Sequence, residues 1–454
     1  MSVLALDIND AGIVAFDGRE IRYREPGYAL LDDGALTTGN DAWHQARLRP
    51  RHIQDHFWSR LDAEALPDQR FRHLTAADLV SRQLEQLAAA AGPGFDKVVV
   101  AVPAYMDAGN LGLFLGICND LGLPVTALVD AAVAATRREY SGAVPVHVDI
   151  SLHSALLTRL GQPGKAQVEK ADVVDAAGIA VLNDAWVRVI AEAFVRQSRF
   201  DPLHTAETEQ LLLDRMPDWL DAAAGGANLN LEIEHRGLTH AAEIEGLTLT
   251  AAAAPVYQRV VAQLRTLVRA GETPALQLSD RAARLPGLAD MLRARVGGEV
   301  FLLESAATAR GLFSRSRGLG GGGSVALLRQ LPWDQSPVAV EAPADDGDGG
   351  RPTHVLFGNH AYAINGQALT LGTRAEDDGR WILLEAAMPG VSRRHCVLEV
   401  DNNQCVVRDV SRFGTFLNGH RLEGSAVLQA GDTLRVGTPG YELQLITVER
   451  DHGT

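Results

Sequence analysis

Two stretches near the C-terminal end decide the fold of that part of the chain: GVSRRH at residues 390–395 and DVSRFGTFLNG at residues 409–419. Short segments rich in β-branched and aromatic residues flank both stretches, and turn residues separate these segments at intervals of about 8–12 residues. This spacing predicts an all-β sandwich in which the two stretches form neighbouring loops. The expected strands are residues 355–357, 381–384, 396–400, 405–407, 433–436 and 441–446.

The first stretch places a serine, two arginines and a histidine on one turn, and the second adds a polar loop shortly after it. A dianionic phosphate is held best by charge-assisted donors, among which the planar guanidinium of arginine can bind two oxygens at once. The layout therefore predicts a site that grips a phosphate group without performing chemistry on it.

The pattern S-x-x-H followed by G-T-F-x-N-G resembles the forkhead-associated (FHA) family, whose members bind phosphothreonine in partner proteins. The resemblance implies that Arg374 clamps the phosphate, although one residue, Thr373, is inserted before it relative to the family pattern. It also implies that Ser392 donates its hydroxyl, that His395 braces the loop, and that the tight turn beyond the second loop falls at residues 418–419. The implied phosphopeptide-binding set is Arg374, Ser392, Arg393, Arg394, His395, Arg412, Phe413, Gly414 and Thr415.

One departure concerns the residue before the Gly-Thr pair, which is commonly asparagine in the family and is Phe413 here. Arg412 is expected to compensate for the missing asparagine. The alternative to phosphate binding is a phosphate-independent interaction module with the same fold.

The composition limits the classes of function. A chain of 454 residues exceeds one ordinary core and predicts two or three domains. Its net charge of −15 argues against broad contact with nucleic acid or with an anionic membrane. The three scattered cysteines form neither a metal-binding pair nor a disulfide framework. The sequence also shows no leader-like start and no long apolar run. Together these features predict a cytoplasmic protein without direct membrane insertion.

A change of composition marks a boundary in the chain. Residues 318–352 are rich in glycine, proline and aspartate, which is typical of a flexible tether, and the apolar piece at residues 325–333 is expected to dock on a neighbour. The predicted domains are therefore residues 1–317, a linker at residues 318–352, and the FHA-like domain at residues 353–450.

The first 317 residues alternate between strand-like and helix-like segments, which predicts an α/β domain. Asp7 and Asp149 each stand at the end of a strand-like segment, which suggests two related halves. The expected strands are residues 3–8, 12–16, 98–102, 146–149 and 275–278, and the expected helices are residues 76–91, 109–121, 179–197, 207–213 and 253–270.

The stretch VVVAVPAY at residues 98–105, the segment LGLPVTALVDAAVAA at residues 121–135, and the order of the pieces around them resemble the Hsp70 nucleotide-binding domain, a member of the actin-like ATPase superfamily. The resemblance implies a two-lobed fold over residues 1–317, but the residues that serve ATP in the family are changed. The two phosphate-binding hairpins have lost their glycines at residues 7–11 and 149–154, and Ser59 stands where the family has its catalytic lysine.

These losses predict a pseudo-ATPase with no catalytic residues, no resident metal and no cofactor beyond a residual Mg-ATP affinity. The vestigial nucleotide cleft is expected to contain Asp7, Asp10, Asp130, Asp149, Ser154 and Arg284. Three of them, Asp7, Asp130 and Asp149, either retain a magnesium ion through water or serve only as strand-end and turn caps. His153 is expected to be a solvated or capped side chain, because nothing near it in sequence makes a catalytic triad.

Three functions fit this sequence. The preferred one is a phosphothreonine-dependent adaptor or scaffold in which the Hsp70-like platform docks one protein and the FHA-like module captures a second, threonine-phosphorylated one. This function implies a Ser/Thr kinase, and the resemblances suggest bacterial machinery. The second is a divergent ATP-binding chaperone or ATPase that its FHA module targets. The third is a fixed assembly in which both modules are structural.

Overall fold

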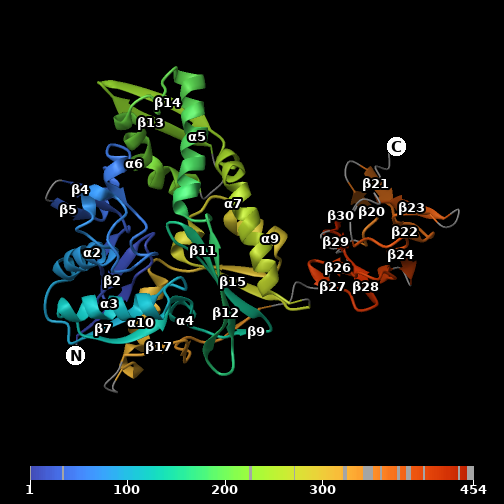
Figure 1. Ribbon diagram of the computed structural model, residues 1–454, viewed down its shortest axis with the longest axis horizontal. Coiled ribbons are helices and arrows are strands. Elements are labelled where there is room, and N and C mark those ends of the chain that lie inside the picture. Colours follow the sequence, from blue (N-terminus) through green and yellow to red (C-terminus); the bar gives the residue numbers. More distant parts are fainter. Residues whose placement is uncertain are drawn as a thin grey trace. The chain divides into compact units, whose positions relative to one another are not determined.

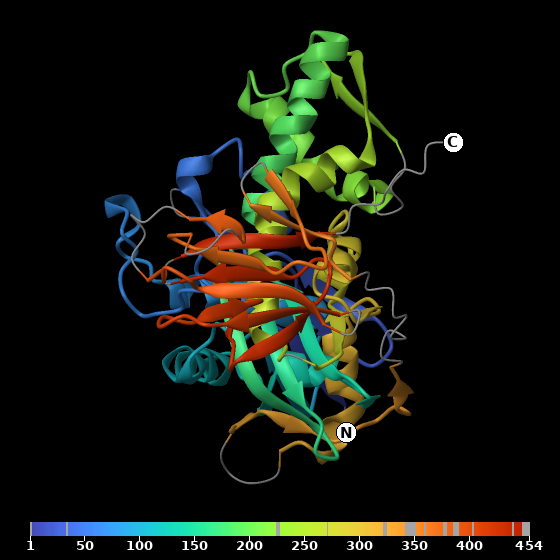
Figure 2. The same ribbon diagram turned by 90° about the vertical axis from the view of Figure 1, so that its right-hand side faces the viewer.

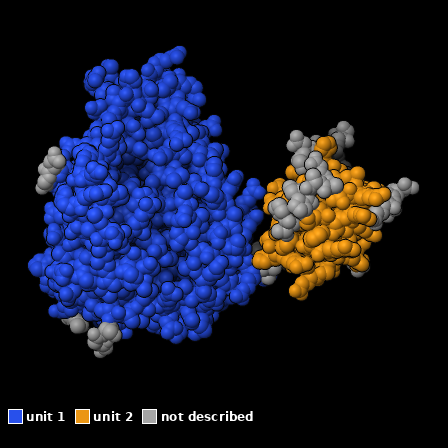
Figure 3. Space-filling view, viewed as in Figure 1, with its two compact units in different colours: residues 1–342 blue, residues 343–454 orange. Residues whose placement is uncertain are grey.

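The computed structural model describes residues 2–32, 35–223, 228–269, 271–320, 325–340, 351–357, 360–375, 379–384, 390–401, 404–437 and 440–446. The chain divides into two compact units, Met1–Ala342 (unit 1) and Pro343–Thr454 (unit 2) (Figure 3). In the described part of the chain, no helix combines the length and the apolar character that a membrane crossing requires.

The first half of unit 1 is built on a six-stranded sheet in the order β17-β8-β7-β1-β2-β3. Strands β1, β2 and β3 form an antiparallel meander. Strands β7 and β8 continue the sheet parallel to β1. These strands are β1 (Val3–Asp7), β2 (Ile13–Phe16), β3 (Ile21–Glu25), β7 (Lys97–Val102) and β8 (Val125–Asp130). A smaller sheet contains β4 (Ala29–Asp32), β5 (Ala35–Thr38) and β6 (Ile53–Gln54). The helices are α1 (Asn40–Trp43), α2 (Ala76–Ala91), α3 (Ala108–Asp120) and α4 (Ala131–Ala135).

The second half repeats the order of five of these strands in the sheet β16-β15-β10-β11-β12-β18, whose sixth strand lies at the opposite end. Again three strands form a meander and two more lie parallel to its first strand. They are β10 (Val144–Ile150), β11 (Ser154–Gly161), β12 (Ala166–Asp175), β15 (Pro274–Leu278) and β16 (Glu299–Leu302). The helices are α5 (Ile179–Ser198), α6 (Ala206–Ala223), α7 (Gly246–Leu267), α8 (Asp280–Ala283) and α9 (Leu288–Arg295), and the hairpin is β13 (Leu229–His235) with β14 (Leu238–Ile244) (Figure 1). Unit 1 is thus mixed α/β, as predicted, with two topologically equivalent sheets.

The sheets are buried because their strands are continuous apolar runs. In β7, Val98, Val99 and Val100 are fully buried, which is the pattern of a parallel strand covered on both faces. Helix α2 begins with a capping box, in which Thr75 and Asp78 satisfy each other's backbone N–H groups, and it turns its apolar stripe toward this sheet.

The segment that follows α10 (Ala307–Arg315) contains short strands where the sequence predicted a flexible tether. Strand β17 (Leu327–Leu328) pairs with β8, and β18 (Gln330–Leu331) pairs with β12, so that one short segment joins the edges of both sheets. Farther on, β19 (Val338–Ala339) pairs with β9 (Tyr140–Ser141). The prediction of a flexible linker over residues 318–352 is therefore wrong for residues 325–340, whereas residues 321–324 and 341–350 lie outside the described residues.

Unit 2 is the predicted β-sandwich. One sheet has the order β21-β20-β30-β29-β26-β27 and the other β23-β22-β24-β25-β28. Figure 2 draws the strands of this unit in orange and red. The strands are β20 (His354–Phe357), β21 (His360–Ala363), β22 (Leu369–Gly372), β23 (Arg380–Leu383), β24 (Cys396–Asp401), β25 (Gln404–Asp409), β26 (Thr415–Leu417), β27 (His420–Arg421), β28 (Ser425–Leu428), β29 (Thr433–Val436) and β30 (Tyr441–Ile446). Inward side chains such as Val355, Leu398 and Leu434 fill the space between the sheets.

Candidate functional site

Three loops of unit 2 form the candidate site: residues 373–375 after β22, residues 390–395 before β24, and residues 410–414 between β25 and β26. The first two loops touch through their backbones, since the N–H of Thr373 donates to the carbonyl oxygen of Ser392 at 3.3 Å. This approach requires a glycine at position 372, because a Cβ there would lie 1.9 Å from the carbonyl oxygen of Arg393.

His395 fastens the second loop to the third. Its Nδ1 accepts a hydrogen bond from the N–H of Ser392 at 3.0 Å, and its Nε2 lies 3.1 Å from the carbonyl oxygen of Gly414, so Nε2 carries the proton. The side chain is fully buried, and burial lowers the pKa of His395 against the opposing effects of this bond and of Asp409. His395 therefore joins the two loops as a neutral ring.

Ser392 joins the same two loops from the other side. Its Oγ accepts a hydrogen bond from the N–H of Arg412 at 3.1 Å and is only partly buried. A hydroxyl that accepts one bond still has its own proton to donate. Ser392 is therefore oriented by the protein while keeping a donor for a ligand.

Asp409 organises the third loop from within. Its carboxylate accepts hydrogen bonds from the N–H of Ser411 at 3.0 Å and from the hydroxyl of Thr415 at 2.9 Å. Burial alone would raise the pKa of Asp409, but these bonds hold it below its ordinary value. The structure thereby corrects one part of the expected binding set: the hydroxyl of Thr415 is buried and already bonded, so Thr415 supports the loop and does not face a ligand.

Four arginines carry the positive charge of these loops: Arg374, Arg393, Arg394 and Arg412, all of them exposed. Among the described residues, none of the four forms an ion pair or a side-chain hydrogen bond that would neutralise it. Guanidinium groups of this kind remain available for an anion.

Arg421 is a fifth cation near these loops, outside the set of residues that the sequence predicted for binding. A Cβ placed on Gly414 would lie 2.6 Å from the Nε atom of Arg421, so this side chain covers the third loop. Gly414 is thus required both by that contact and by its φ of +92°. The position of Arg421 depends on the tertiary structure, because the hairpin turn at Asn418 and Gly419 returns the chain beside the third loop.

Phe413 occupies the position of the family's asparagine and leaves 52% of its surface exposed, beside Val410 at 45%. An aromatic ring cannot accept the hydrogen bonds that an asparagine offers to a peptide backbone. It instead presents apolar surface next to the cations.

Unit 2 matches a family model. The model described as the FHA domain matches residues 370–437, a range that contains all three loops. A comparison of the whole chain with curated proteins found no match. Unit 2 therefore carries an FHA domain, and such a domain is a phosphothreonine-binding module for protein interaction.

The expected nucleotide cleft of unit 1 contains an internal ion-pair cluster. Arg281, from α8, donates to Asp7 at 2.9 Å and to Asp149 at 2.8 Å, and so joins the ends of β1 and β10. Asn9 also donates to Asp149, at 2.9 Å. The two aspartates are buried at the ends of their strands, and Asp149 also accepts a hydrogen bond from the N–H of Ile150 at 2.8 Å.

The other expected cleft residues fall in different places. Asp10 is fully buried and accepts a hydrogen bond from the N–H of Leu152 at 2.8 Å, so it ties the turn after β1 to the turn after β10. Asp130 caps the N-terminus of α4. The Oγ atom of Ser154 lies 3.3 Å from the Oδ1 atom of Asp175. Arg284 is half exposed, and its Nε atom lies 3.9 Å from the Oδ1 atom of Asp221.

A cavity of about 310 Å³ remains between the two halves of unit 1. Its lining comes from both halves and is mainly apolar, with Pro26, Trp43, Ile179, Met216 and Leu285 among its residues. Arg281 lies at one side of this space and Arg284 at another.

Proposed function

We propose that this protein is a phosphothreonine-dependent adaptor. Unit 2 captures a threonine-phosphorylated protein, and unit 1 acts as a non-catalytic platform for a second protein. The observation that carries the proposal is the set of guanidinium groups around Ser392 that have no side-chain partner among the described residues, on loops that His395 and Asp409 hold in place. A Ser/Thr kinase supplies the phosphate, and the covalent connection raises the effective concentration of one bound partner near the other.

The decisive test is binding of a phosphothreonine peptide library to the full chain, with the unphosphorylated library as the control. Each charge-assisted hydrogen bond to phosphate contributes about 1.5–3 kcal/mol, so Arg374→Ala and Ser392→Ala should each weaken binding at least about tenfold. Arg408→Ala is the matched control, because Arg408 is an exposed arginine of the same unit that is already paired with Glu399 at 2.7 Å.

Two outcomes would contradict this proposal. Equal binding of phosphorylated and unphosphorylated peptides would favour a phosphate-independent module. Binding that is selective for phosphate but unchanged by both substitutions would place the site elsewhere on the molecule.

We further propose that unit 1 has a degenerate actin-like, Hsp70-like fold. The support is its duplicated sheet order, in which each half contains a three-stranded meander followed by two parallel strands. The turns after β1 and β10, which would hold the phosphates in such a fold, are bonded to each other through Asn9 and Asp10.

The residues present do not fit a magnesium–polyphosphate ligand. The guanidinium of Arg281 lies between Asp7 and Asp149, where it satisfies both carboxylates with the positive charge that a metal ion would otherwise bring. This argues for the platform and against the alternative function, a divergent ATPase, and we assign no catalytic step to the cleft.

A further inference from the structure

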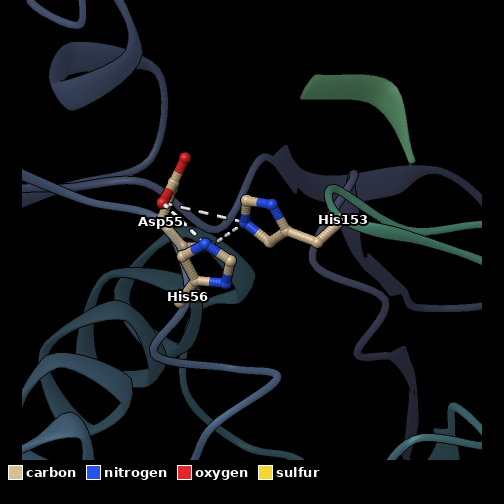
Figure 4. A group of neighbouring side chains, drawn as sticks. All are labelled: Asp55, His56 and His153. Carbon is tan, nitrogen blue, oxygen red and sulfur yellow. Dashed lines mark hydrogen bonds and ion pairs between the residues drawn. The ribbon is translucent and has the colours of Figure 1, made fainter. Parts of the chain in front are cut away.

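A group of two histidines and one aspartate lies at the junction of the two halves of unit 1, outside the FHA site and apart from the cluster around Arg281. Asp55 and His56 follow β6 in the first half, and His153 stands in the turn between β10 and β11 of the second half. Figure 4 shows the carboxylate and the two imidazole rings lying against one another. Within the described residues, this is the group of three or more His, Cys, Asp or Glu side chains whose geometry suits a metal ion.

The distances bring three donor atoms close together. One ligand atom from each residue lies within 4.8 Å of the others. The Nε2 atoms of His153 and His56 lie 3.7 and 3.9 Å from the Oδ1 atom of Asp55. A tetrahedral zinc ion needs bonds of about 2.0–2.2 Å to such atoms. The three side chains must therefore rotate toward a common point to reach this geometry.

The two rings are stacked, with centroids 3.5 Å apart and planes inclined by 15°. An imidazole binds a metal ion through a lone pair in the plane of its ring, so the two stacked rings must open before both can face one ion. Neutral imidazole is the form that binds a metal ion.

His153 gives its Nε2 proton to the carbonyl oxygen of Asp55 at 3.0 Å, so metal binding at Nε2 must replace this bond, with the proton on Nδ1. One more feature favours a cation at this place. Asp10, which interacts electrostatically with both His153 and Asp55, is fully buried and has an Oδ2 atom without a hydrogen-bond partner in the described structure. An extra negative charge nearby stabilises a bound cation.

We propose that Asp55, His56 and His153 bind a divalent transition-metal ion of the zinc type, which links the two halves of unit 1. Two imidazoles and one carboxylate suit zinc better than magnesium or calcium, which prefer oxygen ligands alone. The side chains of His56, Asp55 and His153 are 43%, 29% and 19% exposed, so an ion can reach them from solvent. The proposal does not depend on phosphothreonine binding by unit 2.

The test is a titration of the chelator-treated full chain with Zn²⁺ in competition with a chromophoric chelator. We expect one ion per chain, and a loss of affinity of about tenfold or more in each of His56→Gln, His153→Gln and Asp55→Asn. His44→Gln is the matched control, because His44 faces Asp214 at 2.9 Å on the surface of the same unit. Its affinity should equal that of the unchanged chain.

A second readout separates metal binding from misfolding of a variant. Zn²⁺ should raise the unfolding temperature of the unchanged chain and of His44→Gln, but not that of His153→Gln, although all three proteins unfold cooperatively without metal. The proposal is overturned if no ion binds at micromolar Zn²⁺, or if the His56→Gln and His153→Gln proteins take up zinc as tightly as the unchanged chain.

Discussion

At the scale of single residues, unit 1 depends on charges buried at the junction of its halves. Arg281 is an internal cation shared by Asp7 and Asp149, and its geometry is bidentate toward Asp149, with Nε at 3.1 Å and Nη2 at 2.8 Å. Such a pair costs desolvation when it forms, but the removal of one partner leaves uncompensated charge in a buried site.

Arg281→Leu should therefore lower the free energy of unfolding of unit 1 by about 3–5 kcal/mol, measured by chemical denaturation of the fragment 1–342. Adding Asp7→Asn and Asp149→Asn to that variant should restore part of the loss, because the stranded charges are removed. Arg284→Leu is the control, since Arg284 is 54% exposed and should change stability little. If Arg281→Leu lowers the free energy of unfolding no more than this control does, the cluster around Arg281 does not stabilise unit 1.

Asp10 gives unit 1 a pH dependence of defined sign. Burial raises the pKa of Asp10 to about 6, above its ordinary value of 3.8 in the unfolded chain, so the folded state binds the proton more tightly. The resulting stability is fully present below the unfolded pKa and is lost as the pH rises through the folded one. Asp7, with its pKa also raised to about 6 by burial, adds to the same trend.

Asp10→Asn should thus flatten the fall in stability between about pH 4 and pH 7 and raise the free energy of unfolding at pH 7 by about 1–3 kcal/mol. The amide keeps the oxygen that accepts from Leu152. Denaturant unfolding of the fragment 1–342 at a series of pH values measures both effects. Identical pH profiles for the two proteins would show that the pKa of Asp10 is the same in the folded and the unfolded state.

At the scale of elements, the segment after α10 closes unit 1. Strands β17 and β18 extend both sheets, and Leu331 at the second pairing is only 2% exposed. Arg137 holds the chain just beyond them through an ion pair with Asp334 at 2.6 Å. This one segment therefore covers an edge strand of each sheet and joins the two halves of unit 1.

Cutting the chain after residue 320 should destabilise unit 1 by several kcal/mol relative to a cut after residue 342. The shorter fragment loses the burial of Leu331 and of its apolar neighbours and leaves two strand edges open. Thermal and denaturant unfolding of the two fragments give the comparison. Equal stabilities would mean that the pairings of β17 and β18 contribute nothing.

At the scale of the whole molecule, two compact units carry separate candidate sites: an anion site on unit 2, and a cleft in unit 1 beside which Arg281 is already paired with Asp7 and Asp149. Each ligand should therefore act on one unit alone. A ligand whose free concentration is a hundred times its dissociation constant adds about 2.7 kcal/mol to the free energy of unfolding of the unit that binds it.

A phosphothreonine peptide should raise the unfolding transition of unit 2 in the full chain, whereas Mg-ATP should shift neither transition. Differential scanning calorimetry of the full chain resolves the two units if they unfold separately, and the fragment 1–342 isolates unit 1 if they do not. A rise of unit 1's transition with Mg-ATP would revive the ATPase alternative and contradict the non-catalytic platform.

Local sequence was enough to predict the elements and one site. The spacing of turn residues predicted the sandwich, and the motif around Ser392 and His395 located the loops, because such loops are built by residues close in the chain. The inward role of Thr415 and the position of Arg421 escaped it. The first depends on which face of β26 packs into the sandwich, and the second on the turn at residues 418–419, which returns the chain beside the third loop.

The sequence by itself determined the α/β unit, the β-sandwich and the arginine-rich loops, since strand and helix periodicity and turn chemistry act over a few residues. Only the tertiary structure decided that Arg281 joins Asp7 and Asp149, that His153 meets Asp55 and His56, and that residues 327–331 close two sheets. These contacts link residues about a hundred or more positions apart. Which distant partners meet is settled by the packing of whole sheets and helices, and no local pattern records it.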